Sequence, residues 1–352
     1  MKKWVLFYIL PLSGNCLLLI SRVIIHVCHK QHKGINKGGN RMVDKKTVTF
    51  KGRHFNLVGD IFVPNNFDAH KKYPALVVSH PTSSVGAQTS GLYAKRLAQN
   101  GFVTIAFDAS YQGRSEGDPR NTEDPFVRTE DISSAIDYLV TLKYVDENRI
   151  GAVGICAGGG YTINAAKTER RIKAVAGVAP ANIGATFRGA FGPEDNLLAL
   201  LDKIGQQRTA EARGADVLEV NWIPNSPKEL KESGMTDIDF VEAVDYYRTD
   251  RGYNSLATNL VPFTNYAAIL GFDTNILLEK FLTQPLQIIV GDKVGGFASY
   301  RNGFEVYTRA ASKEKDILVL PNISHYDLYD QPKAVDPAVE KLTAFFEKYL
   351  TV

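Results

Sequence analysis

Two patterns of apolar residues alternate along most of the chain. Six short runs are almost continuously apolar, as expected of strands buried on both faces of a sheet. They lie at residues 74–79, 102–107, 150–155, 172–178, 286–290 and 316–320. Helix-like segments separate several of these runs, at residues 91–99, 129–142 and 299–311. The alternation predicts an α/β fold with a mostly parallel central sheet and helices on both faces.

The pattern changes at the start of this region and in its middle. Residues 47–50 and 56–63 are short β-rich runs that predict an opening hairpin. Between Val178 and Leu286 no comparable strand occurs, and aromatic residues accompany helix-like segments at 196–203, 239–247 and 274–282. Because a structureless loop of that length is uncommon in a compact domain, we predict a helical cap. The cap occupies residues 181–283 and divides the core into residues 47–180 and 284–352.

The first 46 residues form a separate region. Residues 4–28 are apolar with one charge, Arg22, but Pro11 and the polar residues after it interrupt the stretch. A membrane anchor, a cleaved signal peptide and an extension outside the fold are the three interpretations. More cations follow this stretch than precede it, which favours membrane association with the body in the cytoplasm, and secretion is the alternative. Residues 29–40 are a polar linker.

Composition and charge exclude some classes of protein. The chain is 44% apolar and 22% charged, as folded globular proteins are. The net charge of +3 hides an asymmetry, because residues 1–46 hold 9 Lys/Arg and 1 Asp/Glu, leaving 32 against 37 elsewhere. A body without excess cations argues against nucleic-acid binding. Cys16 and Cys28 lie in the N-terminal region, so Cys156 is the single cysteine of the body.

A glycine-rich turn surrounds this cysteine. An apolar strand ends at Ile155, and a helix-compatible run follows Gly158-Gly159-Gly160. Such a turn strains its central residue and needs small neighbours two positions away, which Gly154 and Gly158 provide. Cys156 would then project at a helix N-terminus, where thiolate is favoured. The pattern indicates a nucleophile elbow with cysteine in place of serine, and the alternatives are a phosphate loop or a structural cysteine.

A cysteine nucleophile needs a base, and histidine has a suitable pKa. Of seven histidines, only His325 lies downstream of Cys156, in the loop after the last predicted strand. Enzymes with this architecture order their residues as nucleophile, acid and histidine. We therefore assign the base to His325.

The loop after the first predicted core strand, His80-Pro81-Thr82-Ser83, would contribute to an oxyanion hole. Pro81 has no N–H, so Thr82 is the candidate donor, with Ser83 second, and Ala157 supplies the other N–H. His80 is interpreted as a residue that fixes this loop.

The acid that orients the histidine is expected after the strand at 286–290, where Asp292 is the only carboxylate of the loop. The possible substitutes are Asp108, Asp273 and Asp327. For Asp108 we favour a turn-fixing role.

At these residues the sequence resembles the α/β-hydrolase superfamily, and within it the dienelactone-hydrolase-like group with YcjY-type hydrolases and fungal polyketide transferases. The matching segments run in the expected order at residues 80–82, 107–115, 154–159, 291–295 and 325–329. The resemblance implies an α/β-hydrolase fold and acyl transfer to water or another nucleophile without a cofactor. In many relatives the acid lies a few residues beyond Asp292, where this chain has Gly295 and Gly296.

The sequence therefore predicts a hydrolase of ester, thioester or lactone bonds, with a small acyl compound as substrate. Cys156, His325 and Asp292 form the triad, and the N–H groups of Thr82 and Ala157 hold the oxyanion. The alternatives are an acyltransferase with the same triad and a non-catalytic binding protein with the same fold. No metal is expected, because no His/Cys/Asp cluster has ligand spacing.

Overall fold

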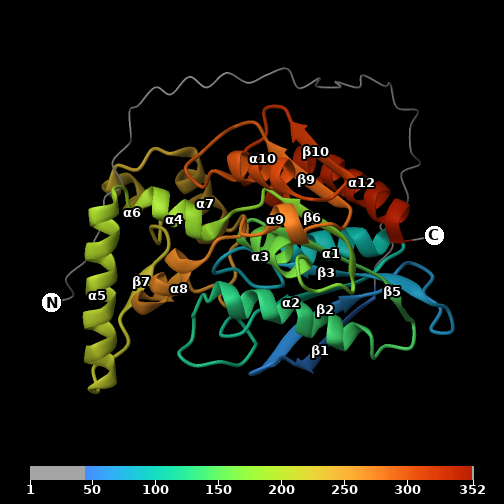
Figure 1. The fold of residues 1–352 in the computed structure, drawn as a ribbon, viewed down its shortest axis with the longest axis horizontal. Helices are drawn as coiled ribbons and strands as arrows, with labels where there is room; N and C mark the ends of the chain where they lie inside the picture. Colours follow the sequence, from blue (N-terminus) through green and yellow to red (C-terminus); the bar gives the residue numbers. More distant parts are fainter. Residues whose placement is uncertain (1–43, 351–352) are drawn as a thin grey trace. The chain divides into compact units, whose positions relative to one another are not determined.

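The computed structural model describes residues 44–350, and its central element is an eight-stranded sheet in the order β1-β2-β4-β3-β5-β6-β9-β10 (Figure 1). The strands are β1 Lys45–Lys51, β2 Asn56–Phe62, β3 Tyr73–Ser79, β4 Val103–Asp108, β5 Val145–Ile155, β6 Ile172–Val178, β9 Leu286–Gly291 and β10 Lys315–Leu320. β2 is antiparallel to both β1 and β4, and all pairs from β4 to β10 are parallel. The predicted hairpin and the mostly parallel sheet are confirmed.

Helices cover both faces of the sheet. Successive strand residues point to opposite faces. A side chain at Gly151 would meet Phe346 of α12 (Pro332–Leu350), whereas one at Gly154, three residues on, would meet α3 (Ala157–Ala166). The helix α1 (Thr89–Gln99) contacts α12, and α2 (Pro125–Leu139) contacts α3. The continuous apolar strands are therefore buried between two helical layers, as expected for a parallel sheet.

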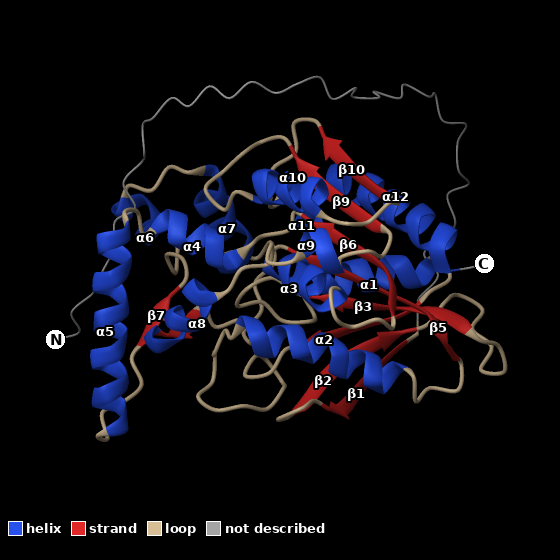
Figure 2. Cartoon of the chain, viewed as in Figure 1, coloured by secondary structure: helices blue, strands red, loops and turns tan. Residues whose placement is uncertain are grey.

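The segment between β6 and β9 is mainly helical and carries a small antiparallel strand pair (Figure 2). Its elements are α4 Ile183–Ala190, α5 Glu194–Ala212, β7 Glu219–Asn221, α6 Pro227–Ser233, α7 Ile238–Arg248, β8 Leu260–Pro262, the 3-10 turn η1 Phe263–Asn265, α8 Tyr266–Gly271 and α9 Leu278–Phe281. The predicted helices at 196–203 and 239–247 fall within α5 and α7. The sequence did not predict β7 and β8, because three-residue strands leave little periodicity.

One predicted helix of this segment is much shorter in the structure. Instead of spanning 274–282, it is the single turn α9. Its start is displaced because the Asp273 carboxylate accepts the Asn275 N–H and the Asn182 side-chain amide, which fixes a turn. Leu277 then adopts a left-handed conformation with φ +63° just before α9.

Aromatic side chains of the same segment pack on one another. Phe187, Trp222 and Tyr266 lie with ring centroids 5.5–6.0 Å apart in tilted or edge-to-face arrangements. Such contacts are typical of a small core. No helix within residues 44–350 is both long and apolar enough to span a membrane, and the apolar stretch 4–28 lies outside the described residues.

Candidate active site

The parallel strands bring the predicted site residues to one edge of the sheet. Cys156 follows β5, His80 follows β3 and His325 lies in the connection after β10. The carboxyl ends of parallel strands meet at the same edge, which is where open α/β sheets hold their ligands. α10 (Ser299–Arg309), which follows β9, begins at this edge as well.

The turn after β5 has the geometry that the glycines predict. Cys156 has φ +57° and ψ −126°, a conformation that L-residues rarely adopt. A Cβ atom at Gly154 would overlap the backbone of Gly158, and one at Gly158 would press on the carbonyl oxygens of Ser79 and His80. The Cys156 N–H donates to Val178 O over 3.0 Å, and its carbonyl accepts from Ala181 N over 2.9 Å. The strained residue is therefore held from both sides.

The thiol of Cys156 meets the imidazole of His325. Cys156 is only 8% exposed, and its thiol is in hydrogen-bond contact with His325 and with the Tyr329 hydroxyl. Burial alone would raise the pKa of the Cys156 thiol. The charge and hydrogen bond of His325, the Tyr329 hydroxyl and the Ala157 N–H outweigh burial and lower that pKa below its usual value. The site thus shifts the thiol toward its thiolate form.

The second nitrogen of the imidazole contacts a hydroxyl, which corrects the prediction for Asp292. His325 Nδ1 lies 3.0 Å from Ser299 Oγ at the first turn of α10. The Asp292 carboxylate is exposed and accepts the Asn322 N–H over 2.6 Å. Since Asp292 comes directly after β9, it reaches the start of the β10 loop and not the histidine, which lies three residues beyond Asn322.

The substitute carboxylates are bound elsewhere too. Asp108 accepts from Gly86 N and Arg114 Nε, in agreement with a turn-fixing role. Asp273 pairs with Arg188. Asp327 accepts from Ser324 N and pairs with Lys333. Within residues 44–350 no hydrogen bond joins a carboxylate to His325, and the group beside its Nδ1 is the Ser299 hydroxyl.

The loop after β3 contains Thr82 and Ser83, the predicted donors of the oxyanion hole. Ser83 N–H points to Glu123 Oε2 at 3.4 Å, whereas no hydrogen bond within the described part of the chain uses the Thr82 N–H. Ala109 N–H donates to His80 Nε2, and His80 Nδ1 lies 2.7 Å from Pro81 O. Burial, together with the charge of Arg128, lowers the pKa of His80, so this imidazole is neutral. These contacts agree with a loop-fixing role for His80.

A buried ion pair is hydrogen-bonded to the loop after β3. Arg128 and Glu123 are 2% and 0% exposed, and their closest atoms are 2.7 Å apart. Arg128 also donates to His80 O over 2.6 Å, and Tyr161 Oη of α3 donates to Glu123 over 2.8 Å. The pair therefore links the loop after β3 to the helix that begins at Cys156.

A carboxylate of α7 holds the segment before Ser299. Asp239 Oδ2 accepts the Phe297 N–H over 2.8 Å, while its Oδ1 is buried without a partner. The Phe297 ring stands nearly perpendicular to the His325 ring, with centroids 5.8 Å apart. Burial, with the nearby charges of Asp237 and Glu242, raises the pKa of Asp239 to about 7.

Sequence reasoning missed three residues of this site, Ser299, Tyr329 and Asp239. Tyr329 lies four positions after His325 in the same motif, and this spacing was a usable signal. Ser299 begins the helix after β9, the part of the chain where the acid was sought. Asp239 lies in the inserted segment, and nothing in its neighbouring sequence indicates a relation to the histidine.

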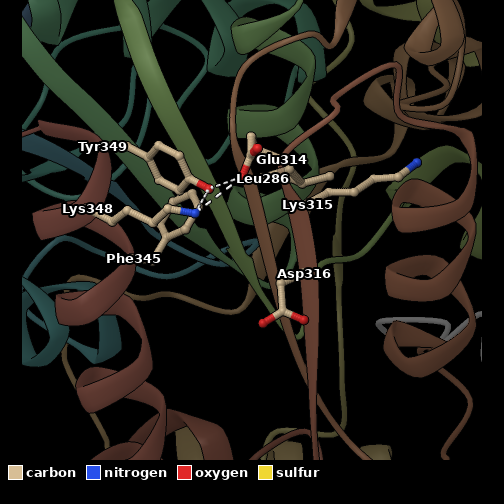
Figure 3. A pocket seen from close by; sticks show the side chains of 7 residues that line it. All are labelled: Leu286, Glu314, Lys315, Asp316, Phe345, Lys348 and Tyr349. Carbon is tan, nitrogen blue, oxygen red and sulfur yellow. Dashed lines mark hydrogen bonds and ion pairs between the residues drawn. The ribbon is translucent and has the colours of Figure 1, made fainter. Parts of the chain in front are cut away.

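A hollow at the opposite edge of the sheet lies outside this site (Figure 3). It is lined by Leu286, Glu314, Lys315, Asp316, Phe345, Lys348 and Tyr349. Leu286 and Lys315 are the first residues of β9 and β10, so the hollow lies at the amino ends of these strands. Glu314 there accepts from Tyr349 Oη and pairs with Lys348, which leaves little unpaired charge for a ligand.

The sheet order, the elbow after β5 and the histidine after the last strand together define an α/β hydrolase. Residues 36–212 match the family model described as PET hydrolase-like. The chain belongs to this family of α/β hydrolases and is a hydrolase.

Relatives and a solved structure extend the match over most of the chain. Protein YcjY of Escherichia coli is 42% identical over 82% of this chain and 93% of its own. The crystal structure of protein PA2218 from Pseudomonas aeruginosa superposes with a TM-score of 0.80 at 29% identity, covering 91% of this chain and all of that one. Thiohydrolase aneE of Aspergillus aculeatus is 25% identical over 62% of this chain and 69% of its own.

Proposed function

We propose that this hydrolase cleaves a carboxylic thioester, ester or lactone by covalent catalysis at Cys156. The observation that carries the proposal is the contact between a thiol in a strained turn and the imidazole of His325. A thiolate is the nucleophilic form of cysteine, and the site lowers the thiol pKa. The similarity to a thiohydrolase supports thioesters as the first substrates to test.

The proposed reaction runs in two halves, with His325 moving the protons in both. His325 takes the proton of the thiol, and Cys156 Sγ attacks the carbonyl carbon. The N–H groups of Thr82 and Ala157 stabilise the negative oxygen of the tetrahedral intermediate. His325 then protonates the leaving thiol or alcohol. In the second half, it takes a proton from water, which attacks the acyl-Cys156 and releases the acid.

The orienting group in this proposal is a hydroxyl. Ser299 Oγ accepts from His325 Nδ1–H and thereby places Nε2 on the side of the thiol. A neutral hydroxyl stabilises imidazolium less than a carboxylate does. This suits a cysteine nucleophile, because the thiolate itself compensates the imidazolium charge and ionises more readily than a serine hydroxyl.

The test is the loss of turnover in Cys156→Ala. Purified protein is assayed with short acyl thioesters and aryl esters, and we expect kcat/KM to fall by about 10⁴-fold or more. Lys203→Ala, on the exposed side of α5, is the control and should keep its activity. Unchanged turnover in Cys156→Ala would remove this residue from the mechanism.

Transfer of the acyl group to an alcohol is the second candidate. The observation that favours it is the 8% exposure of Cys156, since a sheltered acyl-sulfur bond gives an organic acceptor an advantage over water. With added alcohols, a transferase forms ester at the expense of free acid, whereas a hydrolase keeps releasing acid only. The same contact of Cys156 with His325 argues against the non-catalytic alternative.

A further inference from the structure

The hydroxyl of Tyr329 lies beside both the thiol and the imidazole. Tyr329 Oη is 3.2 Å from His325 Nε2, and it is in hydrogen-bond contact with the thiol of Cys156. The side chain is fully buried, with 0% exposure. Three polar groups, Sγ, Nε2 and Oη, therefore meet at one point with no exposed side chain among them.

The position of this hydroxyl is fixed by its helix. Tyr329 belongs to α11 (Asp327–Asp330), which α1 holds through two side chains. Thr89 Oγ1 donates to the Tyr329 carbonyl over 2.9 Å, and Tyr93 Oη donates to the Leu328 carbonyl over 2.8 Å. The Tyr326 ring packs on the Tyr329 ring at 4.5 Å. The aromatic ring therefore has little freedom to turn away from the thiol.

A phenol hydroxyl can accept one hydrogen bond while it donates another. Beside a thiolate–imidazolium pair, Oη accepts from the protonated Nε2 and gives its own proton to sulfur as a hydrogen bond. Hydrogen bonds to an ionised group are about twice as strong as neutral ones. This arrangement favours the ionised pair over the neutral thiol and imidazole.

We propose that Tyr329 is an additional catalytic residue that stabilises the thiolate of Cys156 by donating a hydrogen bond to it. The inference rests on the proposed function, in which Cys156 is the nucleophile. In the ionisation step the Sγ–H bond breaks, an Nε2–H bond forms and tyrosine keeps its proton. In the attack an Sγ–C bond forms, the C–O π bond breaks with its electron pair moving to the carbonyl oxygen, and the hydrogen bond from Oη is lost as the sulfur becomes neutral.

The surroundings of the thiol agree with tyrosine as a donor. Side chains that interact electrostatically with it come from α3, α7, α11 and the loop before α11. They are Tyr161, Tyr247, Tyr326, Tyr329 and His325. Burial and the neighbouring thiolate raise the pKa of Tyr329, which favours the protonated phenol that can donate. His325 is the single cation-forming group in this set.

The test measures the thiol itself. Cys16→Ser and Cys28→Ser leave Cys156 as the only cysteine, and the rate of its alkylation by iodoacetamide is followed against pH. In Tyr329→Phe we expect the thiol pKa to rise by about one unit, and kcat/KM near neutral pH to fall by about tenfold. Tyr349→Phe is the control, because it removes a phenol hydrogen bond to Glu314 at the opposite edge of the sheet and should leave the thiol pKa unchanged.

An unchanged thiol pKa in Tyr329→Phe would overturn the inference even if turnover fell. If Tyr329 served only in packing, its loss could lower turnover but would leave the pKa of the Cys156 thiol unchanged. If Tyr329→Phe does not fold, 3,5-difluorotyrosine at position 329 keeps the shape and donates more strongly. The thiol pKa should then fall, and no shift would contradict the inference. Retained turnover in Cys156→Ala would instead overturn the proposed function, so the two failures are distinguishable.

Discussion

At the scale of single residues, His325 shows that chain order predicts where a residue lies in the fold but not which side chain it contacts. The sequence predicts His325 as the base in the loop after the last strand, and the structure brings its imidazole to Cys156. The sequence also predicts that the group beside His325 Nδ1 comes from the stretch after β9. Which side chain of that stretch turns inward depends on the path of the loop, and here Ser299 does so while Asp292 faces outward.

Ser299→Ala should lower kcat/KM more than a change at Asp292. The substitution removes the hydrogen bond to Nδ1, which contributes about 1 kcal/mol, so we expect a loss of about five- to tenfold. Asp292→Asn keeps an oxygen for the Asn322 N–H and should stay within about twofold of the parent. Steady-state kinetics decide, and a larger loss in Asp292→Asn than in Ser299→Ala would restore the carboxylate to the triad.

The carboxyl of Asp239 should make stability depend on pH. Its pKa of about 7 in the folded protein lies above the usual value of 3.8, so folding binds this proton more tightly. The resulting stabilisation is present at low pH and is lost as pH rises through 7. Between pH 5 and 8 the wild type should lose about 2–3 kcal/mol of unfolding free energy relative to Asp239→Asn.

Urea unfolding of the two proteins at several pH values measures this difference. Asp202→Asn, which removes an exposed carboxylate of α5, is the control and should follow the wild type. A constant difference between wild type and Asp239→Asn from pH 5 to 8 would mean that the group titrates as an ordinary carboxyl.

At the scale of elements, the junction of β5 with α3 was the most predictable part of the site. Any such turn requires glycine or another small residue where strand and helix come close. The glycines therefore indicate, from sequence alone, both the strain at Cys156 and the close approach of Gly158 to the neighbouring backbone. The helical segment between β6 and β9 was less predictable. Its short strands and turns depend on side-chain hydrogen bonds such as those of Asp273, which periodicity does not show.

Gly158→Ala should destabilise the protein and reduce its activity. The added methyl would press on the carbonyl oxygens of Ser79 and His80, backbone atoms that cannot move without shifting the oxyanion loop. We expect a loss of about 1–3 kcal/mol of unfolding free energy. Gly205→Ala is the matched control in the middle of α5, where the methyl meets nothing, and it should stabilise by about 0.5–1 kcal/mol. Thermal unfolding measures the stability of both variants. Equal changes in stability for Gly158→Ala and Gly205→Ala would contradict this account.

Glu123→Gln should destabilise both the fold and the loop after β3. It leaves the guanidinium of Arg128 buried without its counter-charge, which costs about 3–5 kcal/mol. Glu130 lies on α2, the helix that carries Arg128, and pairs with Arg53 of the loop between β1 and β2; Glu130→Gln breaks this exposed pair and should cost less than about 1 kcal/mol. Denaturant unfolding separates the two, and a small effect of Glu123→Gln would show that the buried pair does not hold the loop.

At the scale of the whole molecule, the alternation of buried strands and amphipathic helices was enough to predict the architecture. Each apolar run from residue 74 to 320 corresponds to a strand of the sheet, because strands buried on both faces leave a continuous apolar signature. The sheet in turn explains how His80, Cys156 and His325, far apart in sequence, meet at one edge. The N-terminal apolar stretch lies outside the described residues, and its role stays a separate prediction.

The central claim is that the acyl group passes through the sulfur of Cys156. Intact mass and peptide mass spectrometry after a rapid acid quench, with an acyl thioester as substrate, test it most directly. The account predicts one added acyl mass, on the peptide that contains Cys156, and none in Cys156→Ala. Turnover of the thioester with no adduct on this peptide, and with Cys156→Ala equally active, would contradict it.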